Sequence, residues 1–184
     1  SPRPDGENTL QIARSADGPT SQWVHDTLTT GDNVKLSGPY GTFIGDPAVD
    51  TPILCLAAGT GLAPIMALAE TALRRGCRKP VTLLFSARTE PDVYGHGMMA
   101  WWRTKHRNFD YKVTLTREQK DGFLHGRINE VLPAMFPDLS RHTIFAAGSP
   151  EFVATCVETA KALGAGDDMI YTEEGLQNPT LACP

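Results

Sequence analysis

Beyond residue 50 the chain alternates short apolar runs with longer amphipathic stretches. The apolar runs have the length of buried strands, and the stretches between them carry apolar residues at helical spacing. This alternation is typical of a parallel sheet whose strands are joined by crossover helices. It predicts an α/β fold with a five-stranded parallel sheet and helices on both faces. The expected strands are 53–58, 81–86, 111–116, 143–147 and 169–172, and the expected helices are 64–75, 98–106, 127–135 and 150–163.

The last expected helix has the clearest ends. Ser149 has the side chain of an N-cap, Pro150 suits a first helical turn, and Gly164 suits the position just after a helix. The apolar stripe between these ends consists of Val153, Cys156, Val157, Ala160 and Leu163. The pattern therefore predicts a helix that starts directly at the end of the fourth strand.

The first fifty residues follow a different pattern. Residues 10–13 and 34–36 are short strand-like pieces, and 21–28 between them has the character of a helical turn. Gly/Pro clusters separate these pieces, as in the end of a β-barrel or sandwich rather than in a βαβ unit. We expect a boundary near Ala48, with a partial antiparallel β-barrel in residues 1–48 and the α/β domain in residues 49–184.

Charge and hydropathy exclude several classes of partner. The net charge is −4, and there is no basic stretch longer than a pair of residues, so nucleic acid is not an expected partner. The uncharged run 51–69 approaches the length of a membrane span, but the Gly59-Thr60-Gly61 turn and Pro64 divide it. We expect a strand, a turn and a helix there, and no transmembrane segment. The polar start of the chain is not a signal peptide.

The spacing of the cysteines argues against a metal or cluster site. Cys55, Cys77, Cys156 and Cys183 form no Cys-x-x-Cys pair or related ligand pattern. Two of them lie in apolar surroundings and are interpreted as small buried hydrophobic residues. The cysteines therefore predict no metal and a reducing, cytoplasmic compartment.

Three glycine-containing turns are candidates for ligand binding. Gly59-Thr60-Gly61-Leu62-Ala63-Pro64 follows a buried strand and opens a helix, where glycines and free N–H groups suit a pyrophosphate. Pro64 replaces the third glycine of the common dinucleotide fingerprint, so a purely structural turn is the alternative. The other two, 38–43 (GPYGTF) and 147–150 (AGSP), are each explained equally well as tight corners.

Together, in this order and spacing, the three turns resemble the ferredoxin-NADP reductase superfamily. The resemblance extends to 17–24 (DGPTSQWV), which looks like the segment that holds the flavin pyrophosphate in that family. It implies a flavin-binding barrel followed by an NAD(P)-binding domain. The implied activity is that of an NAD(P)H-dependent flavin oxidoreductase, which passes electrons from NAD(P)H via FAD to a ferredoxin, an iron–sulfur oxygenase or a heme domain.

The resemblance also assigns roles to individual residues. It implies that Gly59, Thr60, Gly61 and Pro64 hold the dinucleotide pyrophosphate, that Gly148, Ser149 and Pro150 hold the nicotinamide end, and that Gly18, Thr20 and Ser21 contact flavin phosphates. Glu173 or Glu174 is the acid expected near the flavin. Arg88, Thr116 and Arg117 are expected at the adenosine end.

The choice between NADH and NADPH stays open at this point. The guanidinium of Arg88 or Arg117 can donate to a 2′-phosphate, but both arginines are also explained as solvated surface charges or as residues that stack on the adenine. Glu118 would oppose a phosphate. The likeness to oxygenase reductases slightly favours NADH, and FAD versus FMN is undetermined.

The chain departs from the family pattern in three respects. The flavin motif Arg-x-Tyr-Ser/Thr is absent, and residues 1–11 resemble the stretch just after it, so we expect the chain to begin inside the barrel. Ala147 replaces a cysteine, and Gly175 stands where an aromatic residue is expected. We therefore expect the chain by itself to bind flavin weakly or not at all. The alternatives are a non-catalytic dinucleotide-binding or scaffold module, and a reductase domain of a larger fused protein.

Overall fold

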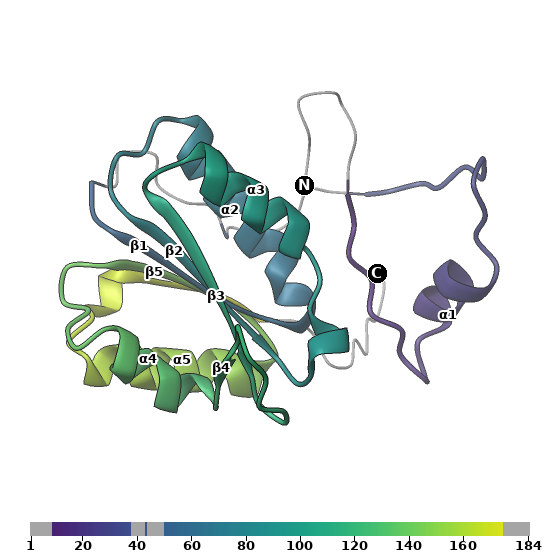
Figure 1. Ribbon diagram of the computed structural model, residues 1–184. Coiled ribbons are helices and arrows are strands. Elements are labelled where there is room, and N and C mark those ends of the chain that lie inside the picture. The colour runs from purple at the N-terminus through teal and green to yellow at the C-terminus, as the bar shows by residue number, and fades with distance from the viewer. Residues whose placement is uncertain (1–8, 38–42, 44–49, 175–184) are drawn as a thin grey trace.

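The computed structural model describes residues 9–37, 43 and 50–174, and its centre is a six-stranded sheet (Figure 1). Every pairing in the sheet is parallel, and the strand order is β4-β3-β2-β1-β5-β6. The strands are β1 (Ile53–Ala58), β2 (Val81–Ala87), β3 (Phe109–Leu115), β4 (Leu124–His125), β5 (Thr143–Gly148) and β6 (Ile170–Glu174).

The predicted number of five strands is wrong by one. All five expected strands are present, and β4 is the addition, a two-residue strand whose Leu124 pairs with Thr114 and whose His125 pairs with Leu115. Two residues are too few to show an alternation of apolar and polar side chains. Only the neighbouring strand β3 makes this segment a strand.

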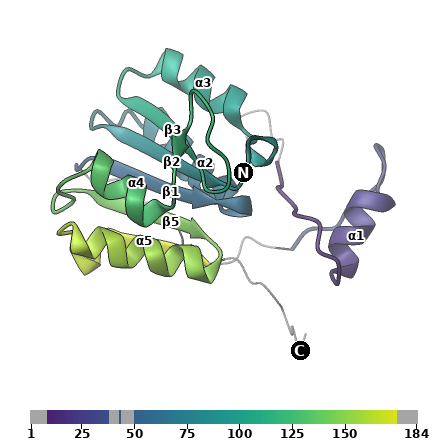
Figure 2. The same ribbon diagram turned by 60° about the horizontal axis from the view of Figure 1, so that its bottom comes forward.

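Helices cover both faces of the sheet, as the sequence predicted. Figures 1 and 2 show α2 (Leu62–Arg74) and α3 (His96–Lys105) on one face, and α4 (Ile128–Met135) and α5 (Pro150–Ala162) on the other. Three single 3₁₀ turns complete the domain: η1 (Gly59–Gly61), η2 (Glu90–Asp92) and η3 (Asp167–Met169). The helices begin and end within a few residues of the predicted positions.

The core consists of two apolar layers that share the central strand β1. Cys55 and Ala57 face the layer under α2 and α3, whereas Leu54 and Leu56 face the layer under α4 and α5. A strand buried on both faces reads as a continuous apolar run, which is why its bounds were predicted correctly. Burial raises the pKa of the Cys55 thiol to about 12, so this cysteine behaves as an apolar residue, as expected.

The ends of α5 also agree with the sequence. The Ser149 Oγ accepts a hydrogen bond from the Phe152 N–H at 3.3 Å, and Pro150 occupies the first turn. Gly164 lies just after the helix with φ of +90°, a conformation that glycine adopts without strain.

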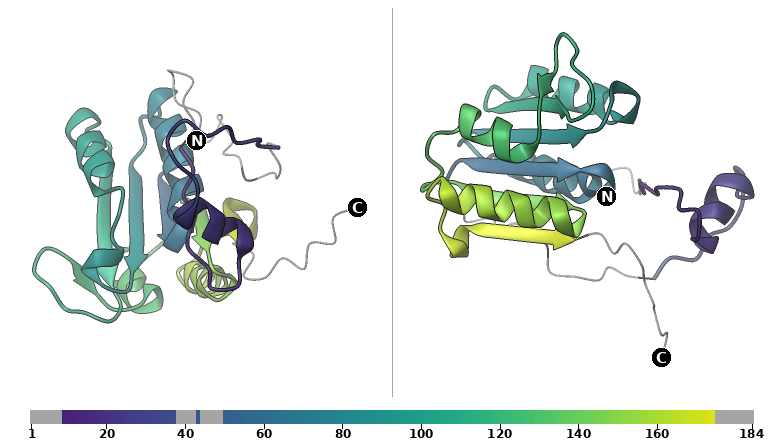
Figure 3. Two further views of the ribbon diagram at one scale, coloured as in Figure 1. Left: turned by 90° about the vertical axis from the view of Figure 1, so that its right-hand side faces the viewer. Right: turned by 90° about the horizontal axis from the view of Figure 1, so that it is seen from below.

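The segment 9–37 contains one helix and no strand. The helix α1 (Pro19–Asp26) confirms the predicted helical turn, and Figures 1 and 3 show it apart from the sheet. The expectation of strands at 10–13 and 34–36 is wrong, because neither segment has a partner in a ladder of backbone hydrogen bonds. The antiparallel barrel is therefore not seen among the described residues, and the proposed boundary near Ala48 lies outside them.

Within the part of the chain that the structure describes, no helix is long and apolar enough to cross a membrane. The uncharged run 51–69 is divided among β1, η1 and α2, as the glycines and the proline predicted.

We predict that Leu56→Ala lowers the free energy of unfolding by about 3 kcal/mol, because it leaves a cavity between β1 and the α4–α5 layer. Leu56 is fully buried and pairs with Leu84 and Ala146 on its two sides. Urea denaturation measures the change. The control is Leu36→Ala, whose side chain is 61% exposed, and we expect it to change stability by less than about 0.5 kcal/mol. Equal losses in the two variants would contradict this description of the core.

Candidate dinucleotide site

The candidate site lies at the carboxyl edge of the sheet, where β1, β2, β3 and β5 all end. Because the strands are parallel, the segments that follow them meet at this edge, and ligands of open α/β folds bind there. Two cavities occupy the edge, one of about 910 Å³ and one of about 330 Å³.

The turn after β1 brings the first predicted residues into the larger cavity. Gly59 has φ of +53°, which only glycine adopts without strain, and Gly59 and Thr60 line the cavity. Helix α2 starts two residues later with no side chain capping its N-terminus. Pro64 lies in its first turn, where a residue without an N–H costs no helical hydrogen bond. The end of α2 that bears a partial positive charge thus faces the cavity.

Gly61 is required by a close contact with β5. A Cβ at Gly61 would lie 2.2 Å from the Ala147 carbonyl oxygen and 2.6 Å from the Gly148 nitrogen. A Cβ at Gly148 would in turn lie 2.8 Å from the Phe152 ring. The two glycine turns therefore pack against each other, and Gly148 and Ser149 line the same large cavity as Gly59 and Thr60. Pro150 follows directly as the first residue of α5.

The remaining walls of the large cavity come from β2, the loop after it and the N-terminal segment. Residues 11–14 line the same cavity as the glycine turns. The lining consists of Gln11, Ile12, Ala13, Arg14, Ala58, Gly59, Thr60, Phe85, Ser86, Ala87, Arg88, Asp92, Tyr94, Thr116, Gly148 and Ser149.

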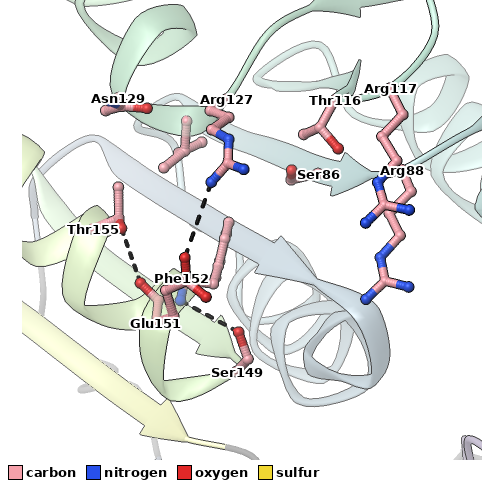
Figure 4. Close-up of a pocket in the computed structure, with 11 residues that line it drawn as sticks. Ser86, Arg88, Thr116, Arg117, Arg127, Asn129, Ser149, Glu151, Phe152 and Thr155 are labelled. Carbon is pink, nitrogen blue, oxygen red and sulfur yellow. Dashed lines mark hydrogen bonds and ion pairs between the residues drawn. The ribbon is translucent and has the colours of Figure 1, made fainter.

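The smaller cavity is basic. Figure 4 shows Arg88 and Arg117 side by side at the ends of β2 and β3, and Arg127 reaching toward Glu151 from the start of α4. The Arg117 N–H donates to the Arg88 carbonyl at 2.9 Å, which keeps the two residues adjacent. Neither guanidinium is paired with a carboxylate in the described part of the chain, whereas Arg127 lies 4.0 Å from Glu151. Thr116, Asn129, Ser149 and Thr155 add polar side chains to the lining.

The carboxylate of Glu118, the residue after Arg117, is held by a backbone N–H. It accepts a hydrogen bond from the Glu90 N–H at 3.0 Å, and Glu90 is paired with Lys120. Glu90 and Glu118 together raise the pKa of Lys120. Glu118 lines neither cavity, so its carboxylate is not part of the basic lining that Arg88 and Arg117 form.

Glu173 and Glu174 lie at the end of β6, on the same edge. Glu173 pairs with Ala147 and Glu174 with Gly148, so both carboxyl groups are level with the second glycine turn. Desolvation raises the pKa of Glu173. Neither residue lines either cavity, so the structure brings them to the correct edge but not into the cavities themselves.

The predicted flavin contacts are not brought to the cavities. Gly18 precedes α1, and Thr20 and Ser21 lie in it. The Ser21 Oγ donates to the Gly18 carbonyl at 2.9 Å and accepts from the Ser15 N–H at 3.0 Å, so it closes the local loop. None of the three residues lines either cavity.

Sequence reasoning missed Arg127 and Tyr94. Arg127 is a single charge at the start of an expected helix, and only the packing of α4 beside α5 brings it into the basic cavity. Tyr94 lies 35 positions from Gly59, yet its hydroxyl donates to the Gly59 carbonyl. No local motif marks either residue, because their positions depend on how separate elements pack.

No group of three or more His, Cys, Asp or Glu side chains that could hold a metal ion occurs among residues 9–37 and 50–174. The chemistry of this edge comes from glycine turns, helix N-termini and guanidinium groups.

A sequence profile of the oxidoreductase NAD-binding domain matches residues 55–158, which contain both glycine turns and all three arginines. The chain belongs to this family. The chain is 28% identical over 170 residues to the ferredoxin–NAD(P)⁺ reductase component of a naphthalene 1,2-dioxygenase system from Pseudomonas putida. This match covers 92% of this chain and 52% of that protein. It is 32% identical over 158 residues to the NADH oxidoreductase HCR of Escherichia coli, covering 85% of this chain and 46% of that protein.

Among solved structures, the chain is similar to a cytochrome P450 reductase from Amycolatopsis. The TM-score is 0.83 at 28% identity, and the match covers 89% of this chain and 50% of that one. The chain spans about half the length of the curated relatives it matches. The comparisons therefore establish the NAD-binding oxidoreductase domain, and they agree with the resemblance that the motifs indicated.

We predict that Gly61→Ala destabilises the NAD-binding domain by about 3 kcal/mol or more, because the added methyl group would collide with the backbone of β5. Thermal or urea unfolding measures the loss. The matched control is Gly97→Ala in α3, where a Cβ meets nothing within 4 Å, and we expect it to stabilise the helix by about 0.5–1 kcal/mol. A Gly61→Ala variant as stable as the parent would contradict the close contact.

Proposed function

We propose that this chain is the NAD(P)H-binding part of a flavoprotein reductase. The reductase would pass electrons from NAD(P)H via FAD to an iron–sulfur or heme partner of an oxygenase system. One observation carries the proposal: two glycine turns and a basic cavity lie next to each other along one sheet edge. The relatives support it, since they are reductase components of dioxygenase systems and an NADH oxidoreductase.

In this proposal the first glycine turn holds the pyrophosphate. Gly59 lines the cavity without a side chain, and Gly61 lets the turn pack closely against β5, so a phosphate can approach the backbone of the turn. The thirteen-residue helix α2 directs the positive end of its dipole to the same place, and Pro64 fits the first turn. The turn can therefore bind the pyrophosphate of a dinucleotide through its backbone and the helix dipole, with no positively charged side chain of its own.

The adenosine end would lie in the basic cavity. Arg88 and Arg117 are adjacent, and neither is paired with a carboxylate among the residues that the structure describes, so both can hydrogen-bond the adenosine phosphates or stack on the adenine. Thr116 lies between the two cavities and lines both of them. A nucleotide in an extended conformation would span the short distance from one cavity to the other.

The nicotinamide end would lie in the large cavity beside Gly148, Ser149 and Pro150. Ser149, the N-cap of α5, lines this cavity, so the N-terminus of α5 lies at its edge. FAD, when bound, supplies the acceptor for the nicotinamide hydride, and the contribution of the protein is to position the dinucleotide. We propose that Glu173 or Glu174 acts near the flavin, since β6 places both carboxyl groups at this edge.

The described residues fit the flavin less well than the dinucleotide. Gly18, Thr20 and Ser21, which the family resemblance assigns to flavin phosphates, line neither cavity. Our proposal retains FAD as the cofactor of the reductase, and it assigns weak flavin binding to this chain by itself.

For the nucleotide, the likeness to oxygenase reductases favours NADH, whereas the three arginines favour a phosphate at the adenosine ribose. Glu118, which would oppose that phosphate, accepts a hydrogen bond from the Glu90 N–H and lines neither cavity. We propose that the site accepts both NADH and NADPH and that the Arg88–Arg117 pair sets the ratio of the two affinities.

We also propose that the protein is cytoplasmic. The thiols of Cys55 and Cys156 are buried and free, as is usual for proteins of a reducing compartment.

We predict that Arg88→Ala and Arg117→Ala each weaken the binding of AMP and of 2′,5′-ADP. The affinity for 2′,5′-ADP should fall by about tenfold in each variant, because its 2′-phosphate would lose a charge-assisted hydrogen bond. Isothermal titration calorimetry measures both affinities. Arg141→Ala is the control, since Arg141 is an exposed arginine just before β5, at the opposite edge of the sheet. Equal affinities in all four proteins would contradict an adenosine site in the basic cavity.

A second candidate function is a binding module without turnover, which the positions of Gly18, Thr20 and Ser21 away from the cavities favour. The two functions differ in electron transfer. We predict that the purified chain carries no stoichiometric flavin, and that added FAD restores slow reduction of a dye by NADH. Absorbance of the flavin and of the dye are the two measurements. NADH binding without any dye reduction would favour the binding module, and tightly bound flavin in the purified chain would contradict weak flavin binding.

A further inference from the structure

Tyr94 links the loop after β2 to the first glycine turn. It lies between η2 and α3, it lines the large cavity, and its hydroxyl donates a hydrogen bond to the Gly59 carbonyl oxygen. Neither the sequence motifs nor the proposed function gives this residue a role.

The tyrosine is held in place on several sides. Its ring packs edge-on against Phe85 with 5.4 Å between the ring centroids. The next residue, Gly95, has φ of +70° and lies close to α2, since a Cβ there would be 3.1 Å from the Met66 sulfur. The start of the loop is fixed by Asp92, whose carboxylate accepts from the Thr89 N–H at 3.0 Å and the Thr89 hydroxyl at 2.8 Å. These contacts order the loop and thereby place the Tyr94 hydroxyl beside the glycine turn.

The phenol is a permanent donor. Burial raises the pKa of Tyr94 to about 12, so the hydroxyl keeps its proton throughout the neutral range. Its acceptor, the Gly59 carbonyl, also accepts from the Leu62 N–H at the start of α2. Two donors from separate elements therefore hold one carbonyl group.

A held carbonyl fixes the whole peptide group, because the peptide bond is planar. In a trans peptide the N–H points in the opposite direction from the C=O. Restraining the Gly59 carbonyl therefore also restrains the Thr60 N–H, in a turn that otherwise contains the two most flexible residues of the motif. The hydrogen bond from Tyr94 acts on a peptide group that lines the large cavity.

We propose that Tyr94 is a positioning residue for the dinucleotide, which orients the Gly59–Thr60 peptide so that its N–H faces the pyrophosphate. The inference rests on the proposed function and adds a residue that determines affinity for the pyrophosphate rather than for adenosine. A purely structural tyrosine would support the loop and the core alone, and its hydroxyl would not distinguish between ligands.

Two ligands separate these roles. AMP reaches the basic cavity and has no pyrophosphate, whereas ADP-ribose carries the pyrophosphate and needs the glycine turn. We expect Tyr94→Phe, which keeps the ring and removes the donor, to weaken ADP-ribose binding about fivefold and to leave AMP binding unchanged. Titration calorimetry on the full chain measures both affinities, and thermal unfolding tests whether the variant is folded.

Tyr111→Phe is the matched control. Tyr111 is buried in the same apolar layer as Phe85, and its hydroxyl contacts His96 at 3.3 Å rather than the glycine turn. We expect this variant to bind both ligands as the parent chain does.

The possible outcomes are distinguishable. A selective loss of ADP-ribose affinity in Tyr94→Phe supports the positioning role. Unchanged ADP-ribose affinity, or equal losses for AMP and ADP-ribose, overturns it while leaving the dinucleotide site in place. A parent chain that binds neither ligand overturns the proposed function and the role of Tyr94 together.

Discussion

The turn after β1 lies against the end of β5 with less room than a methyl group needs, and the rest of the site depends on this contact. Because Gly61 has no side chain, the backbone of α2 can begin directly beside Ala147 and Gly148. The contact brings the N-termini of α2 and α5 to the same cavity, although the two turns are far apart in the sequence. A larger residue at position 61 would separate the two turns and widen the site. The glycines of this motif therefore serve the packing of the fold as well as the approach of a ligand.

The electrostatics of the edge follow from where the carboxylates are held, not from the net charge. The chain as a whole carries a charge of −4, yet the smaller cavity is lined by three arginines and one glutamate. Glu118 and Asp92 accept hydrogen bonds from the backbone of Glu90 and Thr89, and neither lines the smaller cavity. Among the described residues no carboxylate is paired with Arg88 or Arg117, so both can meet an anion.

The N-terminal segment behaves differently from the α/β domain. Five of the seven large apolar side chains that are exposed in the described residues belong to it: Leu10, Ile12, Trp23, Val34 and Leu36. Its extended pieces have no partner strand, so the alternation of apolar residues there does not lead to a ladder. The same segment provides one wall of the large cavity through residues 11–14, which connects it to the site even though the residues assigned to the flavin do not reach the cavities.

The sequence by itself determined the α/β architecture, the strands β1, β2, β3, β5 and β6, both glycine turns and the cap of α5. These features depend on local rules: continuous apolar runs for buried strands, glycine for a positive φ or close backbone approach, and serine for a helix N-terminus. Only the tertiary structure decided the strand β4, the hydrogen bond between the Glu90 N–H and Glu118, the position of Arg127 in the basic cavity and the contact of Tyr94 with Gly59. Each of these features depends on contacts between elements that are distant in the sequence, and such contacts produce no periodic or local sequence pattern.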